Sequence, residues 1–177
     1  MIYVTSDLHF GHDREFVWGA RGYADVNEMN KRQLEKYNAI VTDEDEVWIL
    51  GDCVLGDIEG GLEILKQLKG KIHICLGNHD TGKREQAYRD MGWDVHLAAK
   101  LKYKKLNFYL SHYPTITSNG EIESPTQAVW NIHGHTHATS QWSEYPYCYN
   151  ANIDAHDGYP ISLDIICEEI FNHFGQK

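Results

Sequence analysis

The segment IHICLGNHD, residues 72–80, decides how this chain folds, because an apolar, β-prone run passes directly into a polar cluster. Such a run predicts a short buried strand, and the glycine and polar residues after it mark the strand's end. The same change recurs four more times. Polar clusters follow apolar runs at Asp7-Leu8-His9, Gly51-Asp52, Ser111-His112 and Gly134-His135-Thr136-His137. Because open α/β sheets bind ligands at the carboxyl ends of their strands, we expect the five clusters to converge on one site.

The apolar spacing between these clusters predicts the remaining elements. Amphipathic helices are expected at 27–40, 59–68 and 81–91, and further strands at 95–97, 101–103, 107–110, 129–132 and 161–165. Two mixed sheets packed face to face, with helices outside, are the simplest layering that buries all these runs. We therefore predict an α/β fold in one domain, residues 1–177, because this length suits one sizeable core.

The composition limits the class of partner. The formal net charge is −10, which disfavours nonspecific adhesion to nucleic acid or to anionic membranes. The only dense basic run holds Lys100, Lys102, Lys104 and Lys105. We favour the solvated edge of a β-hairpin for this run, with contact to a phosphate backbone as the alternative.

The cysteines and the apolar runs bear on the cellular compartment. Cys53, Cys75, Cys148 and Cys167 show no C-x-x-C spacing, which favours buried free thiols over disulfides or a thiolate zinc site. The first residues carry no signal-peptide pattern, and no apolar run reaches membrane-spanning length. We expect a soluble cytoplasmic protein without a membrane partner.

Seven side chains in the clusters are candidate metal ligands: Asp7, His9, Asp52, Asn78, His112, His135 and His137. Residues two apart in a strand point the same way, so Asp7 and His9 should share a face. Carboxylate, imidazole and amide oxygen suit Mn²⁺, Fe²⁺ or Zn²⁺. Two ions fit seven ligands better than one, and Asp52 is the natural bridge because a carboxylate has two oxygens. Such a pair of ions suits the hydrolysis of a phosphoester.

In order and type, the motifs D-L-H, G-D, G-N-H-D, S-H and G-H-T-H resemble those of the calcineurin-like metallophosphoesterases, over roughly residues 1–165. The opening D-L-H-F-G-H looks most like compact bacterial or phage-type members. The segment 51–57 lacks the second aspartate and the arginine of the phosphoprotein phosphatase motif G-D-x-x-D-R-G, which argues against that branch.

The resemblance implies a four-layer α/β/β/α sandwich with a dinuclear centre. One metal would be held by Asp7, His9, Asp52 and His137, and the other by Asp52, Asn78, His112 and His135. His79 would contact phosphate and protonate the leaving alkoxide instead of binding metal. The cofactor expected is two divalent ions, Mn²⁺ first, with Fe²⁺, Zn²⁺ and Ni²⁺ as alternatives.

Several residues near the motifs keep two interpretations. His12 either reaches substrate phosphate or shapes the turn at 10–13. Asp80 either orients His79 or caps the following helix, and we lean to the cap. His133 is expected in the core. The polar group Asn152, Asp154, His156 and Asp157 is expected to be a plain loop, with a place for Asn152 near the site as the alternative. Gly11, Gly51, Gly77 and Gly134 are expected to permit tight turns.

The function predicted is a dinuclear metal-dependent phosphoesterase that cleaves a small phosphodiester or nucleotide-type phosphoester with a metal-bridging hydroxide. Catalytic candidates are His79, Asp52 and Asp80, and substrate-binding candidates are Asn78, His79 and His12. The loops 114–125 and 142–149 are candidate substrate walls. One alternative, a catalytically silent scaffold of this fold, is disfavoured because all seven ligands and His79 are retained. A nuclease acting on nucleic acid is disfavoured by the acidic charge.

Overall fold

Two β-sheets form the centre of the computed structural model, which describes residues 1–118 and 121–174. The five-stranded sheet has the order β4-β3-β2-β1-β9, and only β9 is antiparallel to its neighbour. The four-stranded sheet has the order β5-β6-β7-β8, with an antiparallel β5–β6 pair and parallel pairs after it. The strands are β1 (Ile2–Thr5), β2 (Glu46–Ile49), β3 (Lys71–Cys75), β4 (Asp94–His96), β5 (Ala98–Tyr103), β6 (Leu106–Ser111), β7 (Val129–His133), β8 (Cys148–Asn150) and β9 (Ile161–Ser162). Both sheets are mixed, as expected.

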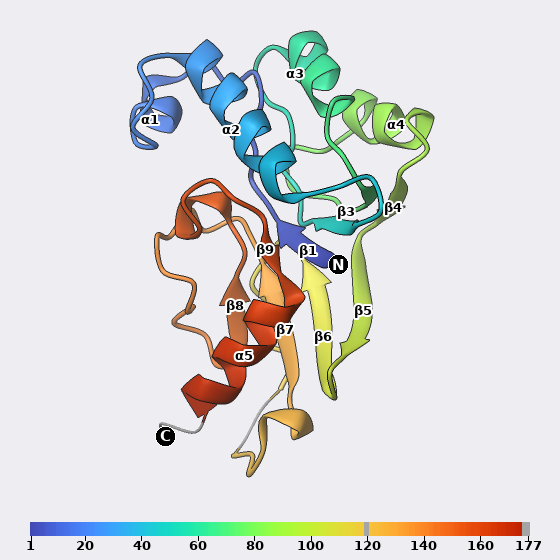
Figure 1. Ribbon diagram of the computed structural model, residues 1–177, viewed down its shortest axis with the longest axis vertical. Helices are drawn as coiled ribbons and strands as arrows, with labels where there is room; N and C mark the ends of the chain where they lie inside the picture. Colours follow the sequence, from blue (N-terminus) through green and yellow to red (C-terminus); the bar gives the residue numbers. More distant parts are fainter. Residues whose placement is uncertain (119–120, 175–177) are drawn as a thin grey trace.

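Four helices lie together on one side of the five-stranded sheet (Figure 1). They are α1 (Glu15–Trp18), α2 (Val26–Ile40), α3 (Ile58–Leu65) and α4 (Lys83–Asp90). α2 begins where the Asp25 carboxylate accepts a hydrogen bond from the Glu28 N–H, and α3 begins where Asp57 accepts from Gly60. The helices α2, α3 and α4 share one buried apolar cluster with the sheet, so burial of this face fixes their layer.

The opposite face of the five-stranded sheet packs on the four-stranded sheet. A second buried cluster contains Val4 and Trp48 from the first sheet and Phe108 and Ile132 from the second. The strands β4 and β5 are separated by Leu97 alone, so the chain passes from one sheet to the other within one residue (Figure 1). The expected α/β sandwich of two mixed sheets is thus confirmed.

The end of the chain corrects one prediction. The strand expected at 161–165 stops at Ser162, and the chain continues as helix α5 (Leu163–Phe174). Leu163, Ile166, Cys167 and Ile170 are its buried residues, at a spacing of three and four that one helix face produces. A short apolar run cannot distinguish strand from helix, and here the helix places Leu163, Ile166, Cys167 and Ile170 in the cluster between the sheets.

Two further predictions, one about the lysine run and one about the cysteines, agree with the structure. Lys100, Lys102, Lys104 and Lys105 are exposed on β5, the edge strand of the second sheet, and in its turn to β6, as the hairpin interpretation required. All four cysteines are free and buried. None of the helices in the described ranges is long and apolar enough to cross a membrane.

Candidate metal centre and active site

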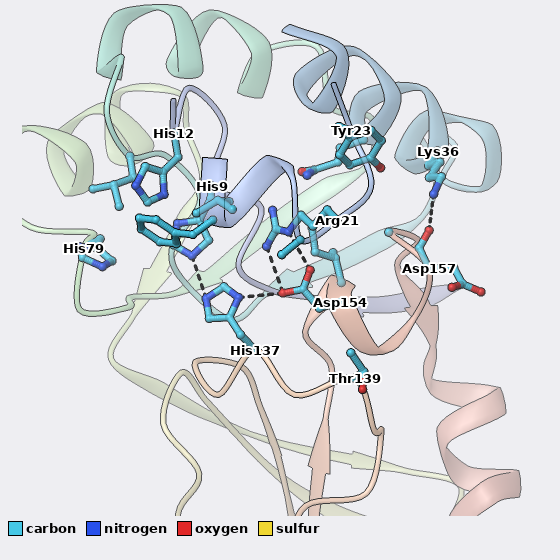
Figure 2. A pocket seen from close by; sticks show the side chains of 17 residues that line it. His9, His12, Arg21, Tyr23, Lys36, His79, His137, Thr139, Asp154 and Asp157 are labelled. Atoms are coloured by element: carbon cyan, nitrogen blue, oxygen red, sulfur yellow. Dashed lines mark hydrogen bonds and ion pairs between the residues drawn. The ribbon is translucent and has the colours of Figure 1, made fainter. Parts of the chain in front are cut away.

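The five polar clusters meet where β1, β2, β3, β6 and β7 end. A first group of ligand atoms brings together Asp7, His9 and His137. The Nε2 atoms of His9 and His137 are 3.2 Å apart, and they lie 3.8 and 3.6 Å from the Asp7 Oδ1 atom. Figure 2 shows the His9 and His137 rings facing each other. These two residues are 128 positions apart in the sequence, so the sandwich itself builds the group.

A second group surrounds the His112 imidazole. Its Nε2 atom lies 2.9 Å from Asn78 Oδ1, 3.1 Å from His135 Nδ1 and 3.5 Å from Asp52 Oδ2. The same Asp52 Oδ2 atom is 4.0 Å from His9 Nε2 in the first group. Asp52 therefore lies between the two groups.

Only the Oδ2 atom of Asp52 faces both groups of described ligand atoms. The Oδ1 atom of Asp52 accepts a hydrogen bond of 2.9 Å from the His79 N–H. We expected the two oxygens of Asp52 to serve the two ions, whereas Oδ2 alone is presented to both groups.

Five of the seven candidate ligands have left-handed backbone conformations: Asp7 (φ 57°), His9 (φ 51°), Asp52 (φ 54°), His135 (φ 69°) and His137 (φ 50°). The strands β1 and β7 end at Thr5 and His133, so strand alternation does not orient these residues, and that part of the prediction was wrong. Left-handed conformations cost non-glycine residues about 1–2 kcal/mol each. They persist at functional sites where the surroundings fix them, here through hydrogen bonds such as Asp7 N–H to Gly51 O at 3.0 Å.

Two glycines are needed for space. A Cβ atom on Gly134 would overlap the Ser6 and Asp7 side chains, and one on Gly77 would overlap the Asp52 carboxylate. Both residues begin turns, as expected, with the Asp80 N–H 3.2 Å from Gly77 O and the Thr136 N–H 2.8 Å from Gly134 O. Neither has a positive φ, unlike Gly11 and Gly51 with φ of 80° and 88°, so space and not backbone conformation requires glycine at these two positions. The backbone of each loop thus approaches a ligand more closely than any side chain would permit.

Burial sets the electrostatics of the first group. Asp7 Oδ2 accepts hydrogen bonds from the Ser6 hydroxyl and the His135 N–H, whereas Oδ1 is buried and accepts no hydrogen bond from any described residue. Burial raises the pKa of Asp7, and burial together with the nearby Arg21 lowers the pKa of His9 to about 2. A neutral imidazole beside an unpartnered carboxylate oxygen fits a divalent cation, since buried polar atoms otherwise need hydrogen bonds.

Hydrogen bonds to the far side of two rings fix which nitrogen faces the site. His112 Nδ1 is 2.8 Å from the Leu50 carbonyl oxygen, and His137 Nδ1 is 2.7 Å from Asp154 Oδ2. Asp154 is in turn held by Arg21, whose Nε atom lies 2.7 Å from Oδ1 (Figure 2). Each bonded Nδ1 leaves Nε2 free to bind a metal, as supporting groups commonly do for ligating histidines.

Asp154 is a functional residue that sequence reasoning missed. We expected a plain loop there, and the 133 positions between Arg21 and Asp154 give no local signal of their pairing. Asn152, also expected in that loop, is buried beside Ser6 and accepts a hydrogen bond of 2.8 Å from the Asp154 N–H.

His79 stands outside both groups of ligand atoms. Its Nε2 atom is 4.0 Å from Asp52 Oδ2, and 41% of its side chain is exposed. His12 lies farther along the same wall, with its ring centroid 5.5 Å from that of His9. Both imidazoles therefore face space that a substrate can enter. His133 is buried in the core, as expected.

Asp80 has neither of its expected contacts. The first residue before α4 is Gly82, so the helix-cap interpretation was wrong. Its carboxylate accepts hydrogen bonds from Tyr88 Oη at 2.7 Å and from the N–H groups of Asp52, Cys53 and Gly77, and its described hydrogen bonds do not include His79. Asp80 ties the loop after β2 to the loop after β3, and so acts on the centre through the backbone.

A pocket of about 860 Å³ opens beside the first group (Figure 2). His9, His12, His79 and His137 line one part of it. The rest is formed mainly by residues 16–23, α2 and residues 153–158. The loops 114–125 and 142–149, expected as substrate walls, contribute no described residue to this pocket.

Comparison with known proteins places this geometry in context. The model of the calcineurin-like phosphoesterase superfamily domain matches residues 1–149. Protein MJ1445 of Methanocaldococcus jannaschii is 31% identical over 177 residues, covering 96% of this chain and 90% of its own. The gene 66 protein of Mycobacterium phage L5 is 31% identical over 163 residues, 77% of each chain. The crystal structure of AQ665 from Aquifex aeolicus has a TM-score of 0.68 at 24% identity, covers 95% of this chain and 98% of its own, and shares the fold.

Proposed function

Because the chain belongs to the calcineurin-like phosphoesterase superfamily, we propose that it hydrolyses a phosphodiester with two divalent metal ions. The observation that carries the proposal is Asp52 Oδ2, which lies 4.0 Å from His9 Nε2 in one group and 3.5 Å from His112 Nε2 in the other. One ion would be held by Asp7, His9, Asp52 and His137, and the other by Asp52, Asn78, His112 and His135. When bound, such a pair lowers the pKa of a water and neutralises phosphate oxygens.

The chain's own groups supply the remaining chemistry. His79 has a half-exposed imidazole at the pocket wall, where it can donate a proton from Nε2 to the leaving oxygen. Its backbone N–H holds Asp52 Oδ1, so one residue both positions the bridging carboxylate and presents the proton donor. Asp80 positions the two loops, and His12 lies where it can contact the substrate.

The pocket favours a phosphate that carries an organic group. Phe16, Val17 and Leu55 give it an apolar lining next to His79. Arg21 donates to Asp154 and to backbone carbonyl oxygens, and Arg84 donates to the His79 carbonyl oxygen. The guanidinium of Arg21 is engaged by these contacts, and Arg84 is not among the described residues that line the pocket. The described lining of the pocket therefore lacks the guanidinium clamp that a doubly charged monoester requires, which supports a singly charged diester.

The physiological setting is also part of the proposal. The four free, buried thiols suit a reducing cytoplasm. The donor set of carboxylate, imidazole and amide suits Mn²⁺. A small phosphodiester or nucleotide substrate agrees with the acidic net charge of −10.

The test is hydrolysis of bis-p-nitrophenyl phosphate by purified protein before and after treatment with a chelator. We expect chelation to abolish the reaction, Mn²⁺ to restore it, and p-nitrophenyl phosphate to react more slowly. Activity that persists through chelation would contradict a metal-dependent enzyme, and a faster monoester reaction would contradict diester preference. A panel of cyclic nucleotides and dinucleotides would then identify the substrate class.

A further inference from the structure

Outside the active site, a cluster of three side chains of metal-ligand type lies at the outer edge of the five-stranded sheet. His73 on β3 is directly opposite Asp94 on the edge strand β4, and His96 follows Asp94 by two positions. The three side chains therefore project from the same face of the sheet. None of them lines the active-site pocket, and none is among the seven ligands of the proposed dinuclear centre.

We propose that His73, Asp94 and His96 form a separate mononuclear zinc site, with water as the fourth ligand. One donor atom from each residue lies within 4.8 Å of the others. Asp94 Oδ2 is 3.2 Å from His73 Nδ1 and 2.9 Å from His96 Nε2. Neighbouring donors around tetrahedral zinc are about 3.3 Å apart for bonds of about 2.0–2.2 Å. Zinc binding thus needs only small side-chain movements.

The contacts of the cluster favour a cation over simple hydrogen bonding. The His96 Nε2 atom is buried and makes no hydrogen bond in the described structure, although the Asp94 carboxylate is 2.9 Å away. The described ion pairs of Asp94 are with the two histidines alone, so no lysine or arginine competes for its charge. The Asp94 side chain is 60% exposed, which leaves the cluster open to an ion from solvent.

The surroundings of the cluster hold His73 in place. The Trp48 indole is stacked on the His73 ring, with centroids 4.5 Å apart and an interplanar angle of 12°, and also contacts the His96 ring. Trp48 Nε1 donates to Glu46 Oε1, which is 3.7 Å from His73 Nε2 on the side away from Asp94. Such outer groups orient ligating histidines. Since β4 pairs with β3 over only three residues, zinc here would tie the edge strand to the sheet.

The first experiment counts zinc per chain after the protein is equilibrated with Zn²⁺ and freed of excess by gel filtration. The variants are His96→Phe, which keeps a ring against Trp48, and Asp94→Asn, which keeps the shape. Lys71→Ala, an exposed change on the same strand β3, is the matched control. We expect both variants to hold one zinc fewer than the wild type, and the control to hold as many. Equal zinc content in the variants and the wild type would overturn the proposal.

A second measurement does not depend on the variants folding. Anomalous diffraction from a wild-type crystal soaked in Zn²⁺ should show a peak bound to His73, Asp94 and His96. In solution, Zn²⁺ should change the fluorescence of Trp48, measured as the difference between wild type and Trp48→Phe. Absence of the peak at this cluster, with zinc present elsewhere in the molecule, would overturn the proposal.

Discussion

Two aspartates lie near opposite ends of strand β1 in opposite circumstances: Asp45, which precedes β2 and contacts Met1, and Asp7, which follows β1. At the start of the strand, Asp45 accepts hydrogen bonds from the Met1 ammonium group and from the N–H and hydroxyl of Thr42, and these contacts lower its pKa to about 2. Just past the end, Asp7 has one buried oxygen that accepts no hydrogen bond within the described ranges, and burial raises the pKa of Asp7. One end satisfies its carboxylate for stability. The other leaves its carboxylate unsatisfied, as a ligand site requires.

The largest expected effect is at Asp52, the carboxylate that lies between the two groups of ligand atoms beside Asp7. Asp52→Asn should remove or disorder both ions and lower phosphodiester hydrolysis at least about 10³-fold, because the lost charge and metals are worth several kcal/mol. Metal content and kcat would be measured together, with Asp45→Asn as the control that keeps both. Two fully occupied metal sites in the Asp52 variant would refute the bridging role.

His79 separates catalysis from metal binding, because it lies beside the metal ligands without being one of them. His79→Gln should lower kcat by about 10²–10⁴-fold, the usual contribution of a proton donor, while metal content stays unchanged. The comparison variant is His12→Gln, which removes another imidazole from the same wall and, as a substrate contact, should raise KM more than it lowers kcat. Undiminished hydrolysis by the His79 variant would exclude the proton-donor role.

Asp154 tests whether the active end also needs support from outside the ligand shell. Its hydrogen bond raises the pKa of His137 and turns Nε2 of that ring toward Asp7. Asp154→Asn should weaken metal binding by about 10–100-fold, measured by titration calorimetry. Asp157→Asn, in the same loop, should leave the affinity unchanged. Equal affinities for the two variants would show that His137 needs no such support.

The smallest effect compares the two carboxylates directly, by thermal unfolding in the presence of a chelator. The folded pKa of Asp45 is below its unfolded value, so its stabilisation is present above about pH 4 and is lost as the pH falls toward 2. Asp45→Asn should therefore lower Tm at pH 7, with a difference that shrinks on acidification. Asp7 has a raised pKa, so its contribution is present at low pH and lost as the pH rises.

Asp7→Asn should accordingly not lower Tm at pH 7. A larger loss of stability at pH 7 for Asp7→Asn than for Asp45→Asn would break the comparison, because the carboxylate at the active end would then be the better satisfied one.

The sequence patterns predicted those features that depend on residues close together in the chain. Apolar runs located β1, β2 and β3, and the motifs after them identified side chains that do lie together, such as Asp7 and His137. The left-handed conformations of Asp7 and His9 could not be predicted, because they depend on backbone contacts to the loop after β2. The Arg21–Asp154 pair joins residues 133 positions apart, and helix α5 depends on the cluster it packs against.

The centre draws its ligands from both layers of the sandwich. Asp7, His9, Asp52 and Asn78 follow strands of the five-stranded sheet, whereas His112, His135 and His137 follow β6 and β7. Ions held by this set would act as a cross-link between the sheets, and their binding energy would add to the cohesion of the seam. The metal affinity would then depend on how the two sheets pack against each other. The core substitution Ile132→Ala removes no ligand, but it should weaken the binding of both ions, because Ile132 packs in the cluster between the two sheets.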